Sequence, residues 1–313
     1  MPTMKAVRIH SFGGPEVLAL EELEVPQPRD DEVLIRVHAA SVNPVDYKIR
    51  AGGFPAVKQD SLPRILGRDL SGTIERCGRA VTGWKAGDEV YAMLDGGGKG
   101  SYAQYVSLAA TLCAPKPKQL NHVEAAALPL AAITAWQGEI DHGKLAEGQR
   151  ELIHGGAGGV GHLAVQIAKA RGARVATTVS RKDVEFARSW GADDVIDYQS
   201  QRFEDEVDEI DLVFDLVGGA TQQRSWAVLK DGGALISTLA QPSESEARAR
   251  HVRAESYVAR PSAAQLREIG NLVDAGRVRP HVQAVFPLEE AAEAQRTLEN
   301  GHVRGKVVLQ MIA

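Results

Sequence analysis

A glycine-rich turn between an apolar strand and a helix constrains the fold of this chain more than any other feature. Leu152-Ile153-His154 is typical of a buried strand, the turn Gly156-Ala157-Gly158-Gly159-Val160-Gly161 follows, and residues 162–170 are typical of a helix. In the spacing G-x-G-x-x-G the first glycine permits a tight turn, the second lets the backbone approach a pyrophosphate, and the third lets the helix pack closely on the strand. The helix N-terminus then offers free N–H groups and positive potential to the phosphates. The pattern predicts a Rossmann-type dinucleotide site, and a purely structural glycine turn is the alternative.

The rest of the chain indicates two domains. Before about residue 120 short strands separated by glycine and proline turns predict a β-rich region. Asn121 and Glu124 then have the spacing of a helix capping box. A length of 313 residues exceeds the usual size of one hydrophobic core. From Glu151 onward apolar segments alternate with helical stretches, which is typical of a parallel sheet with crossover helices. These segments are Leu152-Ile153, Arg174-Val175-Ala176, Asp194-Val195-Ile196, Leu212-Val213-Phe214 and Ala234-Leu235-Ile236.

The end of the strand that follows the turn indicates which dinucleotide binds. Enzymes that use NAD place an Asp or Glu about 20 residues past the turn, on the ribose hydroxyls. This chain has Ser180, Arg181 and Lys182 there and no carboxylate at the strand end. A hydroxyl and two cations suit a 2′-phosphate, so NADPH is favoured over NADH. In the alternative interpretation Ser180 caps the next helix and the two cations are solvated, and both interpretations can hold together.

Composition excludes several classes of partner. The formal net charge of -5 leaves no basic field that would attract nucleic acid or an anionic membrane. No run of about 18 apolar residues occurs, and the first residues lack the features of a secretory signal, so we expect a cytoplasmic protein. Cys77 and Cys113 have no metal-ligand spacing, and we interpret both as packing residues.

Several motifs, taken with the glycine turn, resemble the medium-chain dehydrogenase/reductase superfamily. The resemblance is strongest to its zinc-independent quinone oxidoreductase branch and covers nearly the whole chain. The motifs are Val42-Asn43-Pro44-Val45-Asp46-Tyr47-Lys48, Gly67-Arg68-Asp69-Leu70-Ser71-Gly72, Gly87-Asp88-Glu89-Val90, Asp197-Tyr198, Asp215-Leu216-Val217-Gly218-Gly219 and Gly305-Lys306-Val307-Val308-Leu309.

The resemblance implies an α/β architecture with a GroES-like β-rich catalytic domain and a Rossmann-type domain with a doubly wound parallel sheet. The first domain would comprise residues 1–122 and 262–313, and the second, which binds NADPH, residues 123–261. The cofactor would lie in the cleft between the domains, and the protein would form a homodimer through the edge of the Rossmann sheet. Tyr198 and Lys182 would approach the 2′-phosphate, although Tyr198 could instead be a half-buried aromatic after a strand. Thr134 and Lys306 complete the expected cofactor contacts, and a satisfied helix threonine is the alternative for Thr134.

The resemblance also bears on metal binding. Zinc alcohol dehydrogenases of the same superfamily have a Cys and a His at the positions that Asn43 and Arg68 occupy here, and residues 95–101 contain no thiol. Amide and guanidinium groups cannot replace thiolate and imidazole as ligands, so we expect no metal site. Without zinc as a Lewis acid, a saturated alcohol or ketone is a poor substrate. The substrate should be intrinsically electrophilic, as quinones and conjugated enones or enals are.

Three residues are candidates for the chemistry. Asn43 and Tyr47 could hydrogen-bond the substrate or the nicotinamide, with Asp46 orienting its neighbours; alternatively Asp46 only ties down its loop and Tyr47 is ordinary packing. We therefore predict an NADPH-dependent, metal-independent oxidoreductase that transfers hydride to small quinones or α,β-unsaturated carbonyl compounds. One alternative is an enoyl-thioester reductase, for which Tyr47 is the nearby proton-donor candidate. Another is a catalytically silent NADPH-binding sensor or structural protein.

Overall fold

The computed structural model describes residues 2–311, and the chain divides into two compact units. The β-rich unit comprises Met1–Leu130, Pro261–Asp274 and Pro280–Ala313, and the Rossmann-type unit comprises Ala131–Arg260 and Ala275–Arg279. The domain limits implied by the resemblance stay a prediction. Within the described residues, no helix is both long and apolar enough to cross a membrane.

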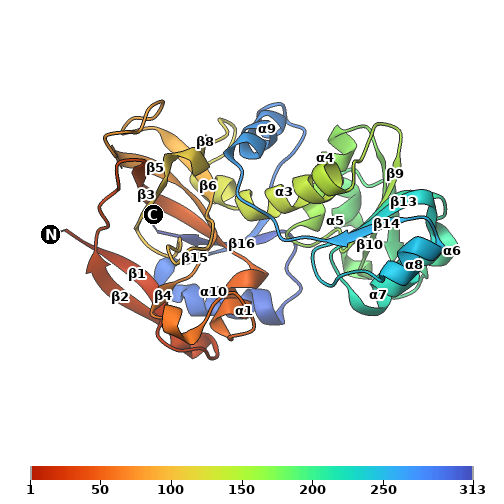
Figure 1. Cartoon of the computed structure of the whole chain (residues 1–313), viewed down its shortest axis with the longest axis horizontal. Coiled ribbons are helices and arrows are strands. Elements are labelled where there is room, and N and C mark those ends of the chain that lie inside the picture. Colours follow the sequence, from red (N-terminus) through yellow and green to blue (C-terminus); the bar gives the residue numbers. More distant parts are fainter. Residues whose placement is uncertain (1, 312–313) are drawn as a thin grey trace. The chain divides into compact units, whose positions relative to one another are not determined.

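The Rossmann-type unit is built on a six-stranded parallel sheet (Figure 1). The strand order β11-β10-β9-β12-β13-β14 reverses direction between β9 and β12. Ligands of open α/β sheets bind outside the carboxyl ends of the strands at such a reversal. The strands are β9 (Arg150–His154), β10 (Arg174–Val179), β11 (Asp194–Asp197), β12 (Ile210–Asp215), β13 (Leu229–Ser237) and β14 (Arg253–Ser256).

Crossover helices connect these strands, as the alternating sequence pattern predicts. The first of them, α4, begins at the third motif glycine, and its residues from Gly161 to Ala168 are all buried. It packs against β9 and β10, which fixes the position of its N-terminus at the end of β9. The helical segments are α3 (Pro129–Trp136), η4 (Gln137–His142), α4 (Gly161–Ala170), η5 (Arg181–Asp183), α5 (Val184–Ser189), α6 (Phe203–Glu206), α7 (Gly219–Arg224), η6 (Ser225–Ala227) and α8 (Glu244–Ala249).

Two sheets form the β-rich unit. Strand β3 is central to the larger sheet because it pairs with β16, β5 and β7. The larger sheet contains β15 (Val282–Pro287), β16 (Lys306–Gln310), β3 (Glu32–Val42), β5 (Asp69–Cys77), β6 (Glu89–Met93), β8 (Cys113–Pro115) and β7 (Tyr105–Ala109), and the smaller contains β2 (Leu18–Glu24), β1 (Thr3–Ile9) and β4 (Arg64–Ile65). The helical segments are η1 (Pro15–Val17), α1 (Pro44–Arg50), η2 (Gln59–Ser61), η3 (Ala110–Leu112), α2 (His122–Ala126), α9 (Ala263–Asp274), η7 (Leu288–Glu290) and α10 (Ala291–Asn300).

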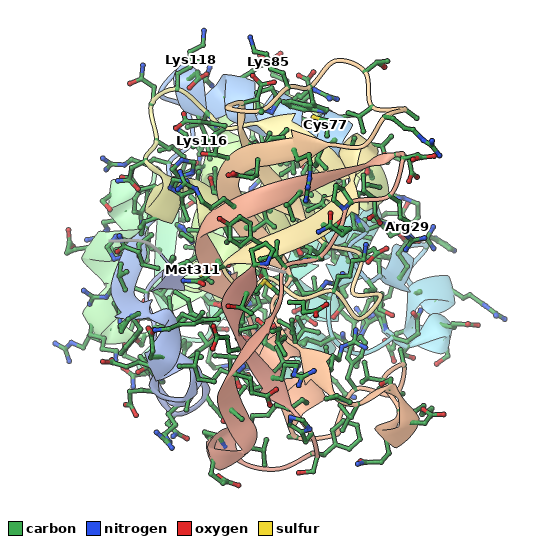
Figure 2. The ribbon with its side chains drawn as sticks, turned by 90° about the vertical axis from the view of Figure 1, so that its left-hand side faces the viewer. Arg29, Cys77, Lys85, Lys116, Lys118 and Met311 are labelled. Carbon is green, nitrogen blue, oxygen red and sulfur yellow. The ribbon has the colours of Figure 1, made fainter. Side chains whose placement is uncertain are left out.

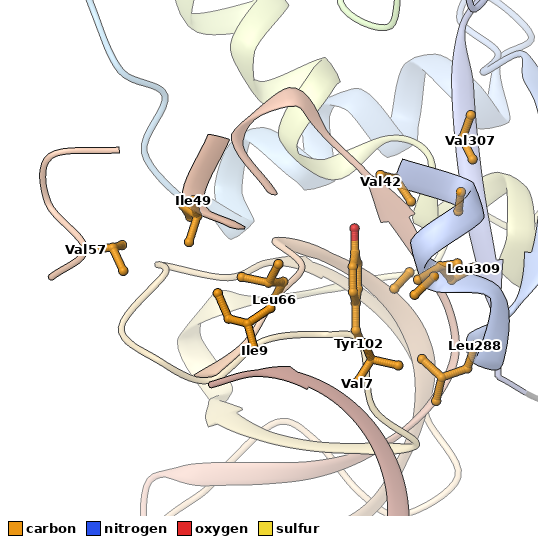
Figure 3. Packing of buried hydrophobic residues seen from close by; sticks show 13 residues of the cluster. Val7, Ile9, Val42, Ile49, Val57, Leu66, Tyr102, Leu288, Val307 and Leu309 are labelled. Atoms are coloured by element: carbon orange, nitrogen blue, oxygen red, sulfur yellow. The ribbon is translucent and has the colours of Figure 1, made fainter. Parts of the chain in front are cut away.

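Local signals explain several of these elements. The predicted capping box is present at α2, where the Asn121 side chain accepts from Glu124 N at 2.9 Å and the Glu124 carboxylate accepts from Asn121 N at 3.0 Å. One apolar cluster of the β-rich unit surrounds the ring of Tyr102, whose hydroxyl points toward the end of β3 (Figure 3). Cys77, labelled in Figure 2, is half-buried and Cys113 is buried, and both pack into a second apolar cluster of this unit.

Two buried carboxyl groups in the Rossmann-type unit lack hydrogen-bond partners. Glu139 of η4 and Glu151 of β9 are both fully buried, and none of their four carboxyl oxygens has a partner among the described residues. Burial raises the pKa of both groups well above the usual range, and the nearby Glu151 raises the pKa of Glu139 further, while Arg171 opposes this rise. Because an ionised carboxylate without a partner is costly in an apolar interior, the folded protein keeps protons on this pair.

We expect the double variant Glu139→Gln/Glu151→Gln to be more stable than the parent above neutral pH, by about 1.4 kcal/mol or more, which is the free energy that corresponds to a pKa difference of one unit between the folded and unfolded states. The pKa of each carboxyl group is higher in the folded state than its value of about 4.3 in the unfolded state. The resulting contribution to stability is fully present below that unfolded pKa and is lost as pH rises through the folded pKa. Urea unfolding of the parent at pH 5 and pH 9 should therefore show a loss of stability that the double variant lacks. The exposed Glu147→Gln serves as the control. A parent whose stability at pH 9 equals that of the double variant contradicts the prediction.

Candidate functional site

The predicted glycine turn lies at the carboxyl end of β9, beside the point where the strand order reverses. Gly155, which precedes the motif, has a φ of +84° and donates its N–H to the Thr178 carbonyl at 3.1 Å. Gly158 N then donates to the Gly155 carbonyl at 3.0 Å, and the His162 ring is bonded to the Gly158 carbonyl at 2.9 Å. The turn is thus anchored to the next strand and to the first turn of α4. Gly155 was not among the predicted site residues, although it directly precedes the motif.

The three motif glycines have different surroundings, which shows where the fold itself excludes a side chain. A Cβ atom on Gly156 would lie 2.1 Å from Thr177 Oγ1, and one on Gly161 would lie 2.2 Å from the Gly155 carbonyl oxygen. Both distances are far below contact, so the fold itself requires these two glycines. A Cβ atom on Gly158 would have the Gly155 carbonyl oxygen as its nearest neighbour, at an ordinary 3.4 Å. Packing does not require glycine at position 158, which leaves room for a ligand such as a pyrophosphate.

The residues expected at a 2′-phosphate gather at the ends of two adjacent strands. Val179, the last residue of β10, pairs with Asp197, the last residue of β11, so Ser180 and Tyr198 follow directly at the same edge. Tyr198 N donates to the Val179 carbonyl at 3.1 Å, and the Tyr198 side chain is 52% exposed. Arg181 and Lys182 are exposed, and Arg181 N donates to Gln199 Oε1 at 3.2 Å. The fold therefore places all four residues at the carboxyl edge of the sheet.

The structure tests one of the two roles predicted for Ser180, the capping of the next helix. Its hydroxyl donates to the Asp183 carboxylate and makes no capping hydrogen bond to the backbone. The capping interpretation is therefore wrong for the side chain. Asp183 is buried and was missed, although the Ser-x-x-Asp spacing is visible in the sequence. The predicted contact of Ser180 with a 2′-phosphate stays a prediction, and Arg181 and Lys182 supply the positive charge at this edge.

A second loop lies at the carboxyl end of β12, across the reversal from the turn. Asp215 is fully buried and accepts from Val217 N at 3.0 Å and from Gly218 N at 2.7 Å through Oδ1. The Val217 side chain is 51% exposed, and its Cγ2 would lie 3.4 Å from a Cβ atom on Gly155. Leu239, past the end of β13, is 47% exposed. The motif Asp215-Leu216-Val217-Gly218-Gly219 was recognised in the sequence, but no role was predicted for the Val217 side chain.

Thr134 lies on α3 and is buried, with 8% exposure. Its backbone carbonyl accepts a hydrogen bond from the Tyr257 hydroxyl. The placement fits a threonine whose polar groups are satisfied within the Rossmann-type unit, and the expected contact with the nicotinamide stays a prediction.

A buried polar network in the β-rich unit contains Asn43. Asn43 Nδ2 donates to Asp69 Oδ2 at 2.9 Å, and its Oδ1 accepts from Lys306 Nζ. Lys306 Nζ also lies 3.4 Å from the Val42 carbonyl oxygen and 3.9 Å from Asp69 Oδ2. Asp69 Oδ2 accepts from Ser41 as well. Both ends of the Asn43 amide are thus bonded and the residue is only 2% exposed, and its predicted contact with the substrate or the nicotinamide stays a prediction.

Asp46 forms the second half of this network. It is fully buried, and its carboxylate accepts from Asn43 N at 2.8 Å, from the Tyr102 hydroxyl at 3.1 Å and from Gly67 N at 3.2 Å. Burial raises the pKa of Asp46 to about 6, with the Asn43 hydrogen bond opposing the rise. Asp46 therefore ties the start of α1 to the loop at Gly67.

Tyr47 and Arg68 differ in the hydrogen bonds of their side chains. Tyr47 is half-buried, and its hydroxyl makes no hydrogen bond with another described residue; burial raises its pKa. Arg68, at the position of the zinc-ligating His, donates through Nε to the Leu94 carbonyl at 2.8 Å. Between residues 2 and 311 no group of three or more His, Cys, Asp or Glu side chains is arranged to hold a metal ion. Tyr47 is thus the predicted catalytic residue with a free polar group.

Comparison with known proteins places this geometry in a family. Residues 29–118 match the family described as "Alcohol dehydrogenase GroES-like domain", and residues 190–309 match the family described as "Zinc-binding dehydrogenase". Together with the six-stranded parallel sheet, these matches confirm the predicted GroES-like and Rossmann-type fold class. The zinc in the second description belongs to the family, whereas this chain has Asn43 and Arg68 at the ligand positions.

Full-length relatives narrow the assignment to a branch. The NADPH-dependent alkenal/one oxidoreductase of Arabidopsis thaliana is 38% identical, over 99% of this chain and 80% of the relative. The structure of the quinone oxidoreductase from Coxiella burnetii has a TM-score of 0.93 at 36% identity, covering 99% of this chain and 100% of that one. The Escherichia coli quinone oxidoreductase complexed with NADPH has a TM-score of 0.87 at 26% identity, covering 98% and 100% of the two chains. The chain therefore belongs to the medium-chain dehydrogenase/reductase superfamily, in the branch of the quinone and alkenal/one oxidoreductases.

Proposed function

We propose that this protein is an NADPH-dependent, metal-independent oxidoreductase that transfers hydride to quinones or to α,β-unsaturated carbonyl compounds. The observation that carries the proposal is the space kept free at Gly158, at the reversal of a parallel sheet. The relatives support it, since one is named as NADPH-dependent and another was crystallised with NADPH.

The residues present fit a dinucleotide with a 2′-phosphate. When bound, NADPH would supply the hydride. The turn and the N-terminus of α4 would hold its pyrophosphate, because free N–H groups and the helix dipole favour phosphate charge there. The exposed cations and aromatic ring at the ends of β10 and β11 would bind the 2′-phosphate. The proposed contacts are Gly156, Gly158, Gly159, Val160 and Gly161 for the pyrophosphate, Ser180, Arg181, Lys182 and Tyr198 for the 2′-phosphate, and Thr134 and Lys306 elsewhere on the cofactor.

Metal independence rests on the partners of two side chains. The Asn43 amide is bonded to Asp69 and Lys306, and the Arg68 guanidinium to a backbone carbonyl, so neither resembles a thiolate or imidazole ligand. A carbonyl substrate must then be activated by its own conjugation. Hydride transfer to an enone or quinone builds a delocalised anion, which hydrogen bonding can stabilise without a metal ion.

We assign Tyr47 to substrate contact and Asn43 and Asp46 to positioning. Tyr47 has a free hydroxyl, and its raised pKa keeps that hydroxyl protonated, so it can donate a hydrogen bond near neutral pH. Asp46 fixes α1, on which Tyr47 lies, through its bonds to Asn43 N and Gly67 N. Loss of Asp46 would therefore act through the placement of α1.

Replacing Arg181 by Glu is expected to weaken NADPH binding roughly 10- to 100-fold while changing NADH binding little. The substitution removes a charge-assisted contact to the 2′-phosphate, and such contacts contribute about 1.5–3 kcal/mol. Fluorescence titration of both cofactors measures the effect. Arg188→Glu, an exposed change on the neighbouring α5, is the matched control. Equal affinities of the parent for NADPH and NADH would refute the cation argument.

The reaction itself is tested by comparing acceptors side by side in the presence of a chelator. We expect small quinones, enones or enals to accelerate NADPH oxidation, with saturated ketones near background, because hydride transfer to a saturated ketone builds a localised alkoxide. Simple alcohols should reduce NADP⁺ negligibly. Robust alcohol oxidation under these conditions removes the metal-free mechanism.

Two other functions remain as outcomes of the same assay. Activity confined to long thioester substrates would indicate an enoyl-thioester reductase, and inactivity with every acceptor despite NADPH binding would indicate a silent sensor or structural protein. The homodimer and the cytoplasmic location also stay predictions, and the name of the Arabidopsis relative places that protein in the chloroplast.

A further inference from the structure

A cavity lies over three short helices of the Rossmann-type unit, formed by residues outside the proposed cofactor set. The helices α6, α7 and α8 lie close to one another in Figure 1. Beneath them an apolar cluster contains Phe203, Trp226 and Ala247. The cavity has a volume of about 510 Å³, within the range of small-molecule sites.

The lining of this cavity has an excess of positive charge. Arg202, Arg224 and Arg250 face it from three different segments, against two carboxylates, Glu204 and Glu246. The lining itself therefore has one more positive than negative charge, and the carboxylate of Asp205, which pairs with Arg202 at 3.8 Å, is exposed and lies outside the lining. Partly enclosed walls concentrate the resulting field, which favours an anion inside.

Two of the three guanidinium groups are held in place by the protein. The Arg224 guanidinium lies over the Phe203 ring, 4.8 Å from its centroid, and Nη1 is 3.4 Å from Glu204 Oε1. Arg250 donates through Nε to Glu246 at 3.0 Å and through Nη1 to the Trp226 carbonyl at 3.3 Å. Each guanidinium has five N–H donors, so these contacts leave several unused. A ligand would therefore meet donors that are already ordered, which lowers the entropic cost of binding.

We propose that this cavity is a binding site for a small organic anion with carboxylate or phosphate groups. The planar fork of an arginine pairs with either group through two parallel hydrogen bonds. Such an anion would use the donors of Arg224 and Arg250 that their present contacts leave unused. The site is separate from the proposed nucleotide site, so its test does not depend on the proposed function.

Calorimetric titration of the full chain at low ionic strength tests the site, with succinate as the carboxylate probe and glycerol 3-phosphate as the phosphate probe. We expect saturable binding of at least one probe, and the preferred probe identifies the acidic group. Arg224→Gln and Arg250→Gln should each weaken this binding about tenfold or more, because each removes a charge-assisted contact.

Arg248→Gln provides a matched control on α8, the helix that Arg250 caps at its C-terminal end. Arg248 pairs with Glu244 as Arg250 pairs with Glu246, both at i,i+4 spacing, but Arg248 does not line the cavity. Binding that is unchanged in this variant supports the site. The proposal is overturned if neither probe binds saturably, if Arg248→Gln loses as much affinity as Arg250→Gln, or if NADP⁺ displaces the probe, which would place the anion at the nucleotide turn.

Discussion

Replacing Gly158 by Ala is expected to weaken NADPH binding about 100-fold while leaving the stability of the protein within about 0.5 kcal/mol of the parent. The new methyl group meets the Gly155 carbonyl oxygen only at ordinary contact distance, so the fold accommodates it. It would occupy the space in which a pyrophosphate approaches the backbone, and losing one or two charge-assisted hydrogen bonds accounts for the magnitude. Cofactor titration and urea unfolding measure the two quantities on the same preparation.

Gly161→Ala is the matched control for this experiment. Its Cβ atom would lie 2.2 Å from the Gly155 carbonyl oxygen, so the turn must shift and stability should fall by roughly 1–3 kcal/mol. The two variants therefore separate a glycine kept for a ligand from a glycine kept for packing. A Gly158→Ala protein that binds NADPH as tightly as the parent would show that the space serves no pyrophosphate.

Replacing Lys306 by Met is expected to destabilise the protein by about 3–5 kcal/mol. Lys306 is 3% exposed, and its ammonium group lies near two fully buried carboxylates, Asp69 and Asp46. Removing it leaves those charges uncompensated in the interior and frees Asn43 Oδ1 from its donor. Denaturant unfolding at pH 7 measures the loss, with the exposed Lys5→Met as the control.

The defect of Lys306→Met should also depend on pH. The positive charge of Lys306 lowers the pKa of Asp46, so its removal raises that pKa further above about 6. A folded pKa raised above the unfolded value of about 3.9 means that stability is lost as pH rises through the folded pKa. The variant should therefore be closer to the parent at pH 5 than at pH 8. Adding Asp69→Asn should recover part of the loss, and a defect that is equal at both pH values and insensitive to this second change contradicts the charge argument.

Much of the nucleotide half of the site could be predicted from sequence because its signals are local. The strand, glycine turn and helix are consecutive, and the spacing of the glycines is itself the signal. The contact that excludes a side chain at Gly161 lies within the turn, whereas the one at Gly156 comes from Thr177 on the next strand. Because these signals are local, they did not predict the hydrogen-bond partner of the Ser180 hydroxyl. Spacing alone does not say whether its hydroxyl faces a phosphate, caps a helix or donates to Asp183, and the structure selects Asp183.

The surroundings of the candidate catalytic residues could not be predicted from the sequence. Asn43, Asp46 and Tyr47 lie within one short segment, and from the sequence they were predicted to act together. In the structure the first two are buried in a network while the Tyr47 hydroxyl stays free. Whether a side chain is buried depends on the residues that pack against it, and these belong to other helices and strands.

The sequence by itself determined the alternation of strands and helices and the glycine turn, because each is a matter of residue type and short-range spacing. The substitution of both zinc-ligand positions followed from the resemblance to a known family. Only the tertiary structure decided which partners these residues meet. Lys306 reaches Asn43 across 263 residues because β16 pairs antiparallel with β3, with Val307 opposite Val42. The three cavity arginines likewise meet only when α6, α7 and α8 pack over one apolar cluster. Such contacts follow from strand register and helix packing, which bring together residues that are far apart in the sequence. The sequence around each residue does not indicate its partner.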